Sequence, residues 1–237
     1  MIQCLRPAAI AFAAFLLAST SIAADKRPMK VDDMFKLKRV AAPQISPDGK
    51  LVAYQVTAVN LAENKSSAAI WVAASDGKTP PKQITDAKGK KDTAPRWSPD
   101  GKKLLFESTR SGTPQLWVVS AEGGEPKQLT DISTGAATGM WSPDGTSIAF
   151  VSAVYPEFSE KPFAESDKLN KEKDEEIEKS TVKAKVFTRL FYRHWDEYVG
   201  DKREHLFVIG ADGKGVSRCD SRRSRCVPNK HHIQQRR

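Results

Sequence analysis

A short motif that combines serine, proline, aspartate and glycine occurs three times in the 237-residue chain, at Ser46–Lys50, Ser98–Lys102 and Ser142–Thr146. Proline presets its own φ angle, aspartate tolerates left-handed conformations, and glycine takes positive φ without a steric cost. Between apolar segments the motif therefore predicts a hairpin turn. Because the residues around the turn recur as well, the three copies indicate an internal repeat, and the repeat limits the possible folds more than any other feature of the chain.

Each repeat contains four short segments that are rich in β-branched and aromatic residues and are typical of strands. The first segment precedes the turn, at 43–45, 95–97 and 138–141, and the second follows it, at 51–56, 103–108 and 147–152. The third contains a tryptophan at 70–72 and 116–119, and the fourth is PKQITD at 81–86 and PKQLTD at 126–131. The turn serines lie 52 and then 44 residues apart. A period of about 40 to 50 residues with four strands is typical of a β-propeller blade.

The sequence therefore predicts an all-β fold, a partial β-propeller of about three four-stranded blades over residues 43–214. Four of the five tryptophans fall on two repeat positions, namely Trp97 and Trp141 before the turn, and Trp71 and Trp117 in the third strand. We interpret them as packing residues between blades, with stacking on a ligand as the alternative.

The third repeat is interrupted by an insertion at about 155–200. Its third-strand segment, LFVI at 206–209, comes about 40 residues later than the repeat predicts. Residues 165–179 are dense in charge of both signs, which predicts a solvated helix or a mobile loop, with a recognition role as the alternative. Residues 186–195 return to a strand-like pattern.

The amino terminus has the pattern of a secretory signal peptide over residues 1–23. Arg6 precedes an apolar stretch at 7–18, and small residues before Ala24 favour cleavage after Ala23. The apolar stretch is too short to span a membrane stably. We therefore expect a secreted or periplasmic protein, with a lead-in segment at 24–42.

The tail at 215–237 lacks the strand pattern of the repeat, and we predict that it is divergent and disordered. It contributes +6 of the net charge of +9 and Arg6 contributes +1, so the rest of the chain is nearly neutral. That distribution argues against a nucleic-acid partner, although a basic tail for nucleic acid or membrane is the rival interpretation. Cys219 and Cys226 would be able to pair in an oxidising compartment. We favour an accidental origin for both, by translation of the tail out of frame.

Motifs that carry catalytic chemistry are missing from the sequence. There is no G-x-S-x-G nucleophile elbow, no phosphate-binding glycine loop and no H-E-x-x-H zinc motif. The most interesting polar cluster is the one around His194, which is flanked by Arg193, Trp195 and Asp196, and we interpret His194 as a hydrogen-bonded structural histidine. We therefore predict no catalytic, cofactor-binding or metal-binding residue in this chain, and no cofactor.

Several segments together resemble the amino-terminal propeller of secreted serine peptidases of the prolyl oligopeptidase family, of the acylaminoacyl-peptidase and dipeptidyl-peptidase type. They are MFKLKRVAAPQISPDGKLVAYQV at 34–56, PRWSPDGKKLLFESTRSGTPQLWVVSAEGGEPKQLTD at 95–131, and, most specifically, RLFYRHWDEYVGDKREHLFVI at 189–209. The resemblance covers about residues 29–214.

The resemblance implies a two-domain enzyme, in which a propeller restricts access to an α/β-hydrolase domain that cleaves short peptides with a Ser, Asp and His triad. No residue of this chain matches a triad position, so we expect a propeller fragment that is inactive alone and whose packing partner is a hydrolase domain. The alternative is a periplasmic TolB-like binding or scaffolding propeller without enzymatic activity. We also expect the open arc of blades to be marginally stable or prone to aggregation when it is alone, because it leaves edges and apolar faces uncovered.

Overall fold

The computed structural model describes residues 27–86, 89–182, 184, 187, 193–220 and 225–226. The chain divides into two units, Met1–Met34 and Phe35–Arg237. In the first unit, the guanidinium group of Arg27 donates two hydrogen bonds of 2.7 Å to the carboxylate of Asp33, at the start of helix α2 (Val31–Lys36). The predicted signal peptide at 1–23 lies outside the described residues.

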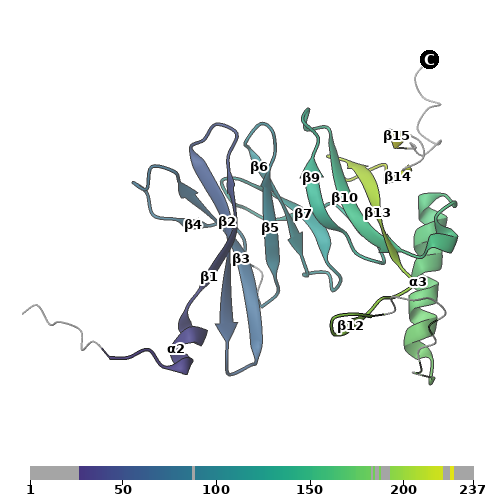
Figure 1. The fold of residues 1–237 in the computed structure, drawn as a ribbon. Helices are drawn as coiled ribbons and strands as arrows, with labels where there is room; N and C mark the ends of the chain where they lie inside the picture. The colour runs from purple at the N-terminus through teal and green to yellow at the C-terminus, as the bar shows by residue number, and fades with distance from the viewer. Residues whose placement is uncertain are drawn as a thin grey trace, which may run out of the picture. The chain divides into compact units, whose positions relative to one another are not determined.

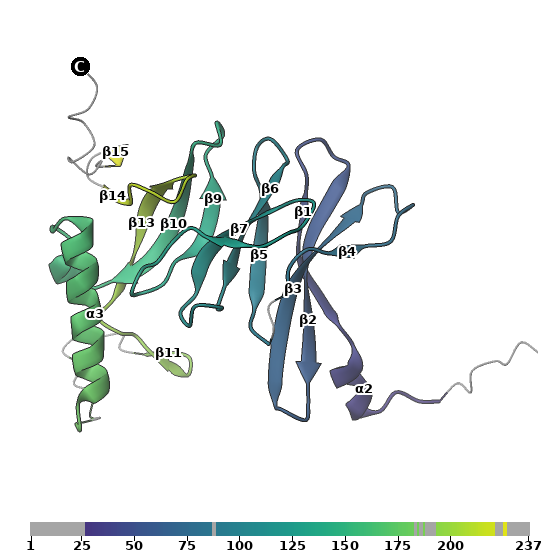
Figure 2. The ribbon, with the colours of Figure 1, turned by 180° about the vertical axis from the view of Figure 1, so that it is seen from behind.

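Three antiparallel sheets make up most of the described part of the second unit, and each corresponds to one sequence repeat. Blade 1 contains β1 (Arg39–Ile45), β2 (Leu51–Asn60), β3 (Lys65–Ala74) and β4 (Lys82–Gln83). Blade 2 contains β5 (Asp92–Trp97), β6 (Lys103–Ser108), β7 (Gln115–Ser120) and β8 (Lys127–Gln128). Blade 3 contains β9 (Ala137–Trp141), β10 (Ser147–Val154), β13 (Arg203–Gly210) and β14 (Ser217–Asp220), extended by β15 (Arg225–Cys226). Figures 1 and 2 show the three sheets side by side in chain order. The prediction of a partial β-propeller with three four-stranded blades is confirmed.

Each blade has two faces, because successive residues of a strand point to opposite sides of the sheet. The register allows the same naming in all three blades. Face A carries Ala53 and Val72 in blade 1, and the residues at the same repeat positions in the others; face B carries Tyr54 and Trp71 and their equivalents.

Face A of one blade packs on face B of the next blade, and this happens twice. Between blades 1 and 2 the buried cluster is Ala53, Ile70, Val72, Ile84, Leu104, Phe106 and Val119. Between blades 2 and 3 it is Leu105, Leu116, Leu129, Ile132, Ala136, Ile148, Phe150, Val154, Phe207 and Ile209. Trp97, Trp117 and Trp141 pack against these clusters, and the indole Nε1–H of Trp97 donates to the carbonyl oxygen of Gln44 in blade 1 at 2.9 Å. These three tryptophans are therefore packing residues between blades.

The three turns share one hydrogen-bond pattern. In the first, the Ser46 hydroxyl donates to Asp48 Oδ1 at 2.6 Å, and the backbone N–H of Lys50 donates to the same oxygen at 3.1 Å. Gly49 follows with a φ of 73°, and its N–H donates to the Ser46 carbonyl oxygen at 2.9 Å. The other two copies repeat the serine–aspartate hydrogen bond, at 2.6 Å and 2.5 Å. The serine and aspartate side chains are thus used to close the turn.

A β-bulge interrupts the first strand of every blade, and the sequence pattern did not predict it. The bulge residues Ala42, Ala94 and Thr138 have φ angles of 51°, 51° and 55°, a region that non-glycine residues rarely adopt. Each of them stands four residues before the turn serine. Pro43 or Pro95 follows the bulge in two blades, and at such a position a missing N–H removes no ladder hydrogen bond. The bulge is therefore a regular part of the repeat.

The insertion contains helix α3 (Phe163–Lys179), which follows the short 3-10 helix η1 (Pro156–Phe158). Of the two predicted states of residues 165–179, the helix is confirmed. The helix is anchored by Asn170, whose side chain is fully buried and whose Oδ1 accepts the backbone N–H of Tyr155 at 2.8 Å. The Tyr155 hydroxyl in turn donates to Asp174 at 3.0 Å. Burial, together with this hydrogen bond, raises the pKa of Tyr155 to about 12. One buried amide and one tyrosine are thus among the groups that hold a helix that is polar almost all round.

The rest of the insertion is described only in part. The predicted strand-like segment at 186–195 has strand β11 (Arg193–His194) near its end, and β11 forms a hairpin with β12 (Glu197–Tyr198). The ring of Phe187 stacks on that of Tyr198, with the centroids 5.2 Å apart. Residues 188–192 and the side chain of His194 lie outside the described residues.

The prediction that the tail has no strand was wrong for its first part. Strand β14 pairs with β13 in the register Phe207 to Arg218, in the place where the repeat requires a fourth strand. Cys219 is disulfide-bonded and stands opposite Cys226 in the pairing of β14 with β15. Backbone pairing with β13 does not depend on the PKQ(I/L)TD pattern, which is why the sequence missed the strand. The disulfide agrees with the expectation that Cys219 can pair in an oxidising compartment. Residues 221–224 and 227–237 lie outside the described residues.

The turn aspartates predict a loss of stability in acid. The serine hydroxyl, followed by the backbone N–H two residues on, lowers the pKa of Asp144 to about 2, and the pKa values of Asp48 and Asp100 are lowered for the same reasons. The pKa of these aspartates in the folded state lies below the unfolded value of about 3.9. Their ionisation therefore stabilises the fold above that value, and this stabilisation is lost as the pH falls towards 2. Replacing Ser142 with alanine removes the largest cause. In urea titrations, the free energy of unfolding of S142A should lie below that of the unmodified chain at neutral pH. The gap should narrow as the pH falls from about 4 to about 2. A residual gap should remain, because S142A also loses the hydrogen bond that the Ser147 N–H donates to the Ser142 hydroxyl. A gap that stays constant would contradict this origin.

A glycine substitution tests the packing between blades 2 and 3. A Cβ atom on Gly139 would lie 2.8 Å from Leu116 Cδ2 and 2.9 Å from Leu105 Cδ2, and both leucines are fully buried. Gly139→Ala should therefore lower the free energy of unfolding by about 1 to 3 kcal/mol. Gly200→Ala is the matched control, because no atom lies within 4 Å of its added methyl group. Equal free energies of unfolding for the two variants in urea titrations would contradict the close packing of Leu105 and Leu116 against Gly139.

Candidate functional site

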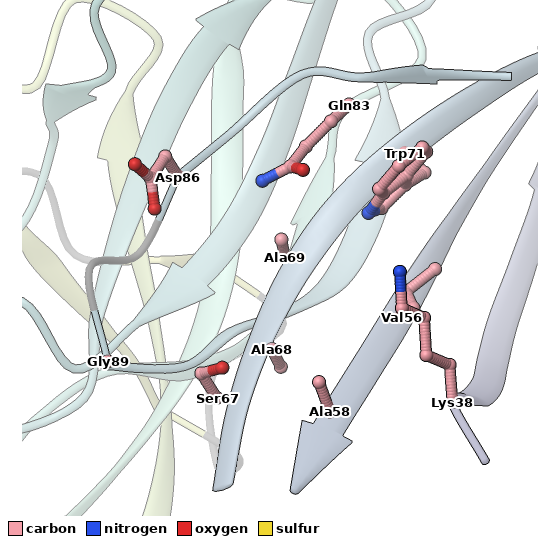
Figure 3. A pocket seen from close by; sticks show the side chains of 10 residues that line it. All are labelled: Lys38, Val56, Ala58, Ser67, Ala68, Ala69, Trp71, Gln83, Asp86 and Gly89. Carbon is pink, nitrogen blue, oxygen red and sulfur yellow. The ribbon is translucent and has the colours of Figure 1, made fainter. Parts of the chain in front are cut away.

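Face B of blade 1 carries a pocket of about 180 Å³, and β2 and β3 form its floor. Val56, Ala58, Ser67, Ala69 and Trp71 supply this floor from alternate positions of the two strands, since Val56 pairs with Ala69 and Ala58 with Ser67. The close-up in Figure 3 shows these side chains beside Lys38, Gln83 and Asp86, which come from the segments on either side of the hairpin. The pocket is therefore apolar at its floor and polar at its rim.

The polar groups of the rim already have partners within the fold. The Lys38 ammonium lies 5.9 Å from the centroid of the Trp71 ring, a cation–π distance. The side-chain amide of Gln83 donates to the carbonyl oxygen of Thr85 at 2.9 Å. None of the ten described lining residues is a histidine or a cysteine.

A polar cluster lies inside blade 2, and no pattern in the sequence predicted it. Asp92 is fully buried, and its carboxylate accepts hydrogen bonds from the Ser108 hydroxyl at 2.7 Å and from Arg110 Nη2 at 2.5 Å. The guanidinium group of Arg110 also lies 5.9 Å and 5.7 Å from the ring centroids of Phe106 and Trp117. The carboxylate of Asp92 and the guanidinium group of Arg110 neutralise each other, and the Ser108 hydroxyl donates to the carboxylate, so the cluster joins β5 to β6.

The sequence predicted no catalytic, cofactor-binding or metal-binding residue, and the structure adds no test of that expectation. Within the described ranges, no group of three or more His, Cys, Asp or Glu side chains is placed to hold a metal ion. None of the helices described here is long and apolar enough to cross a membrane.

The chain matches the model of the TolB β-propeller domain (PD40) over residues 21–179. It is 40% identical over 124 residues to the uncharacterized peptidase YuxL of Bacillus subtilis, a match that covers 52% of this chain and 19% of YuxL. It is 33% identical over 175 residues to dipeptidyl-peptidase 5 of Porphyromonas gingivalis, which covers 74% of this chain and 23% of that enzyme. The chain thus spans about a fifth to a quarter of the length of these relatives.

Solved structures share the fold at low sequence identity. The acylaminoacyl peptidase of Pyrococcus horikoshii superposes with a TM-score of 0.53 at 20% identity, over 78% of this chain and 25% of that one. The isopeptidase AtxE2 gives a TM-score of 0.57 at 17% identity, over 82% of this chain and 32% of the other. The resemblance to the propeller of prolyl oligopeptidase-type peptidases is confirmed, and the chain belongs to the TolB β-propeller domain family.

Proposed function

We propose that the chain forms part of the amino-terminal propeller of a secreted serine peptidase that cleaves short peptides, and that it has no activity by itself. The observation that carries this proposal is the 33% identity over 175 residues to a dipeptidyl-peptidase, because this match takes in 74% of the chain. The stronger but shorter match to YuxL, also named a peptidase, supports the same class.

In this proposal the propeller acts through access and docking. A catalytic α/β-hydrolase domain with a Ser, Asp and His triad would be its packing partner, and the propeller would restrict which peptides reach the triad. The chain supports such a role with a regular stack of blades whose cores are apolar. Its hydrogen-bonding groups in the turns and in the Asp92 cluster serve the fold itself.

Two observations support export from the cytoplasm. The first is the signal-peptide pattern over residues 1–23. The second is the disulfide bond of Cys219, since disulfides persist in oxidising compartments and are rare in the cytosol.

A second candidate function is a TolB-like binding or scaffolding propeller without a peptidase activity. It is favoured by the family match itself, because the matching model describes the TolB propeller domain and no catalytic domain.

The native polypeptide distinguishes the two functions. Antibodies against residues 89–179 would isolate it from fractionated cells of the source organism, before treatment with a fluorophosphonate probe that labels reactive serines. We expect a labelled polypeptide in the extracytoplasmic fraction that releases dipeptides from chromogenic peptide substrates. The recombinant 237-residue chain is the control, and it should take up no probe.

An isolated native polypeptide that contains these residues and takes up no probe would refute the peptidase proposal and leave the scaffolding one. Labelling of the recombinant chain would refute the claim that the chain is inactive alone.

A further inference from the structure

Asp–Gly pairs occur in turns between antiparallel strands of all three blades, at Asp48, Asp76, Asp100, Asp144 and Asp212. Such a pair is open to a spontaneous reaction, because glycine has no Cβ atom to shield its backbone nitrogen. The nitrogen bonds to Cγ of the aspartate and closes a succinimide ring, while the nitrogen proton and the carboxyl hydroxyl leave as water. A water molecule then opens the ring at either carbonyl carbon, and one of the two products is isoaspartate.

The backbone of the five turns is alike. Each turn glycine has a φ angle between 68° and 83°, and its N–H donates to the carbonyl oxygen three residues earlier, at 2.9 Å for Gly49 and 3.2 Å for Gly77. Oδ1 of each aspartate accepts the backbone N–H two residues later. The ammonium of the following lysine lies 3.8 Å from Asp48 and 3.6 Å from Asp76. The backbone therefore does not distinguish one Asp–Gly pair from another.

A serine hydroxyl distinguishes three of the aspartates. The serine two residues earlier donates to Oδ1 of Asp48, Asp100 and Asp144 at 2.6, 2.6 and 2.5 Å. This hydrogen bond is the largest cause of the lowered pKa of all three carboxyl groups. A carboxylate resists attack by nitrogen far better than a neutral carboxyl group does. The serine thus fixes the side chain away from the glycine nitrogen and keeps it in its unreactive form.

The other two turns lack a hydroxyl at this position. Ala74 stands two residues before Asp76, and Gly210 stands two residues before Asp212. Both otherwise match the serine of the repeated turn, because their carbonyl oxygens accept the N–H of the turn glycine. In these two turns, one contact fewer has to break before Cγ can reach the nitrogen.

We propose that Asp76 and Asp212 are sites of isoaspartate formation in the folded chain, and that the turn serine protects the other three aspartates from this reaction. The serine then has a chemical role in addition to closing the turn. The proposal uses only contacts within single turns, and it does not depend on the peptidase proposal. Isoaspartate at Asp76 would lengthen the main chain between β3 and β4 by one carbon atom.

Two variants that exchange the residue two positions before the aspartate test the proposal in both directions. Ala74→Ser supplies the hydroxyl in the turn of Asp76, and Ser98→Ala removes it from the turn of Asp100. The 237-residue chain and both variants are incubated for weeks at about pH 5, just above the ordinary carboxyl pKa of about 3.9. Peptide mapping with electron-transfer mass spectrometry then quantifies isoaspartate at each of the five sites.

In the unmodified chain, isoaspartate should form at Asp76 and Asp212 about three to ten times faster than in the three repeated turns, the range expected for one hydrogen bond. A74S should slow the reaction at Asp76 by a similar factor, and S98A should accelerate it at Asp100. Each variant should leave the other four sites unchanged. In urea that unfolds the chain, the five sites should react at similar rates, because the turn contacts are then absent.

Equal rates at the five sites of the folded chain would overturn the proposal, and so would a rate at Asp76 that A74S does not change. A difference between the two groups of sites that persists in urea would overturn it as well, because its cause would then be the local sequence and not the folded turn. Ser98 is buried, and S98A loses the hydrogen bond from the Lys103 N–H too. A74S, whose fold is checked by circular dichroism, therefore decides the outcome if S98A does not fold.

Discussion

Apolar packing of face A on face B between successive blades is the interaction on which the rest of the structure depends. A four-stranded sheet is thin, and it cannot bury its own side chains without a neighbour. Ile70, Leu116 and Phe150 are fully buried only because another blade lies against them. At about 25 cal/mol for each Å² of apolar surface removed from water, such contacts provide most of the favourable free energy of folding.

The hydrogen-bonded details serve this packing. Serine and aspartate side chains close the turns that join the first two strands of each blade. The turns of blades 1 and 2 lie close together, since a Cβ atom on Gly101 would be 3.7 Å from Pro47 Cδ. The indole of Trp97 reaches across to the backbone of blade 1. The insertion also packs on an apolar cluster, because the ring of Phe163, at the start of α3, contacts the ring of Phe207 edge to face with the centroids 5.9 Å apart. Polar groups thus fix the geometry in which the apolar faces meet.

The sequence predicted the parts of the fold that have a local cause. Turn chemistry located Gly49 and its equivalents, enrichment in β-branched and aromatic residues located the long strands, and tryptophan spacing identified residues between blades. It did not predict the bulges at Ala42, Ala94 and Thr138, because the unusual φ angle of a bulge is imposed by pairing with the next strand and not by residue type. Strand β14 and the Asp92–Arg110 ion pair were missed for a related reason, since both depend on contacts between residues that carry no periodic signal.

For the candidate site, the sequence correctly placed Trp97, Trp117 and Trp141 between blades but did not foresee that Trp71 would line an open pocket. That difference depends on which blade has a neighbour on face B, and residue type does not encode it. A chain of stacked blades differs in this respect from a globular domain with a single hydrophobic core. Its stability is a sum of contacts between neighbouring blades.

Hydrogen exchange of the backbone amides, measured by NMR at concentrations where the chain is monomeric, tests this account most directly. Blade 2 is the blade whose two faces are both covered, so the amides of β6 and β7 should exchange more slowly than those of β2 and β3 in blade 1 and of β10 and β13 in blade 3. Equal protection in all three blades, or stronger protection in blade 1 than in blade 2, would contradict the claim that each blade is stabilised by its neighbours.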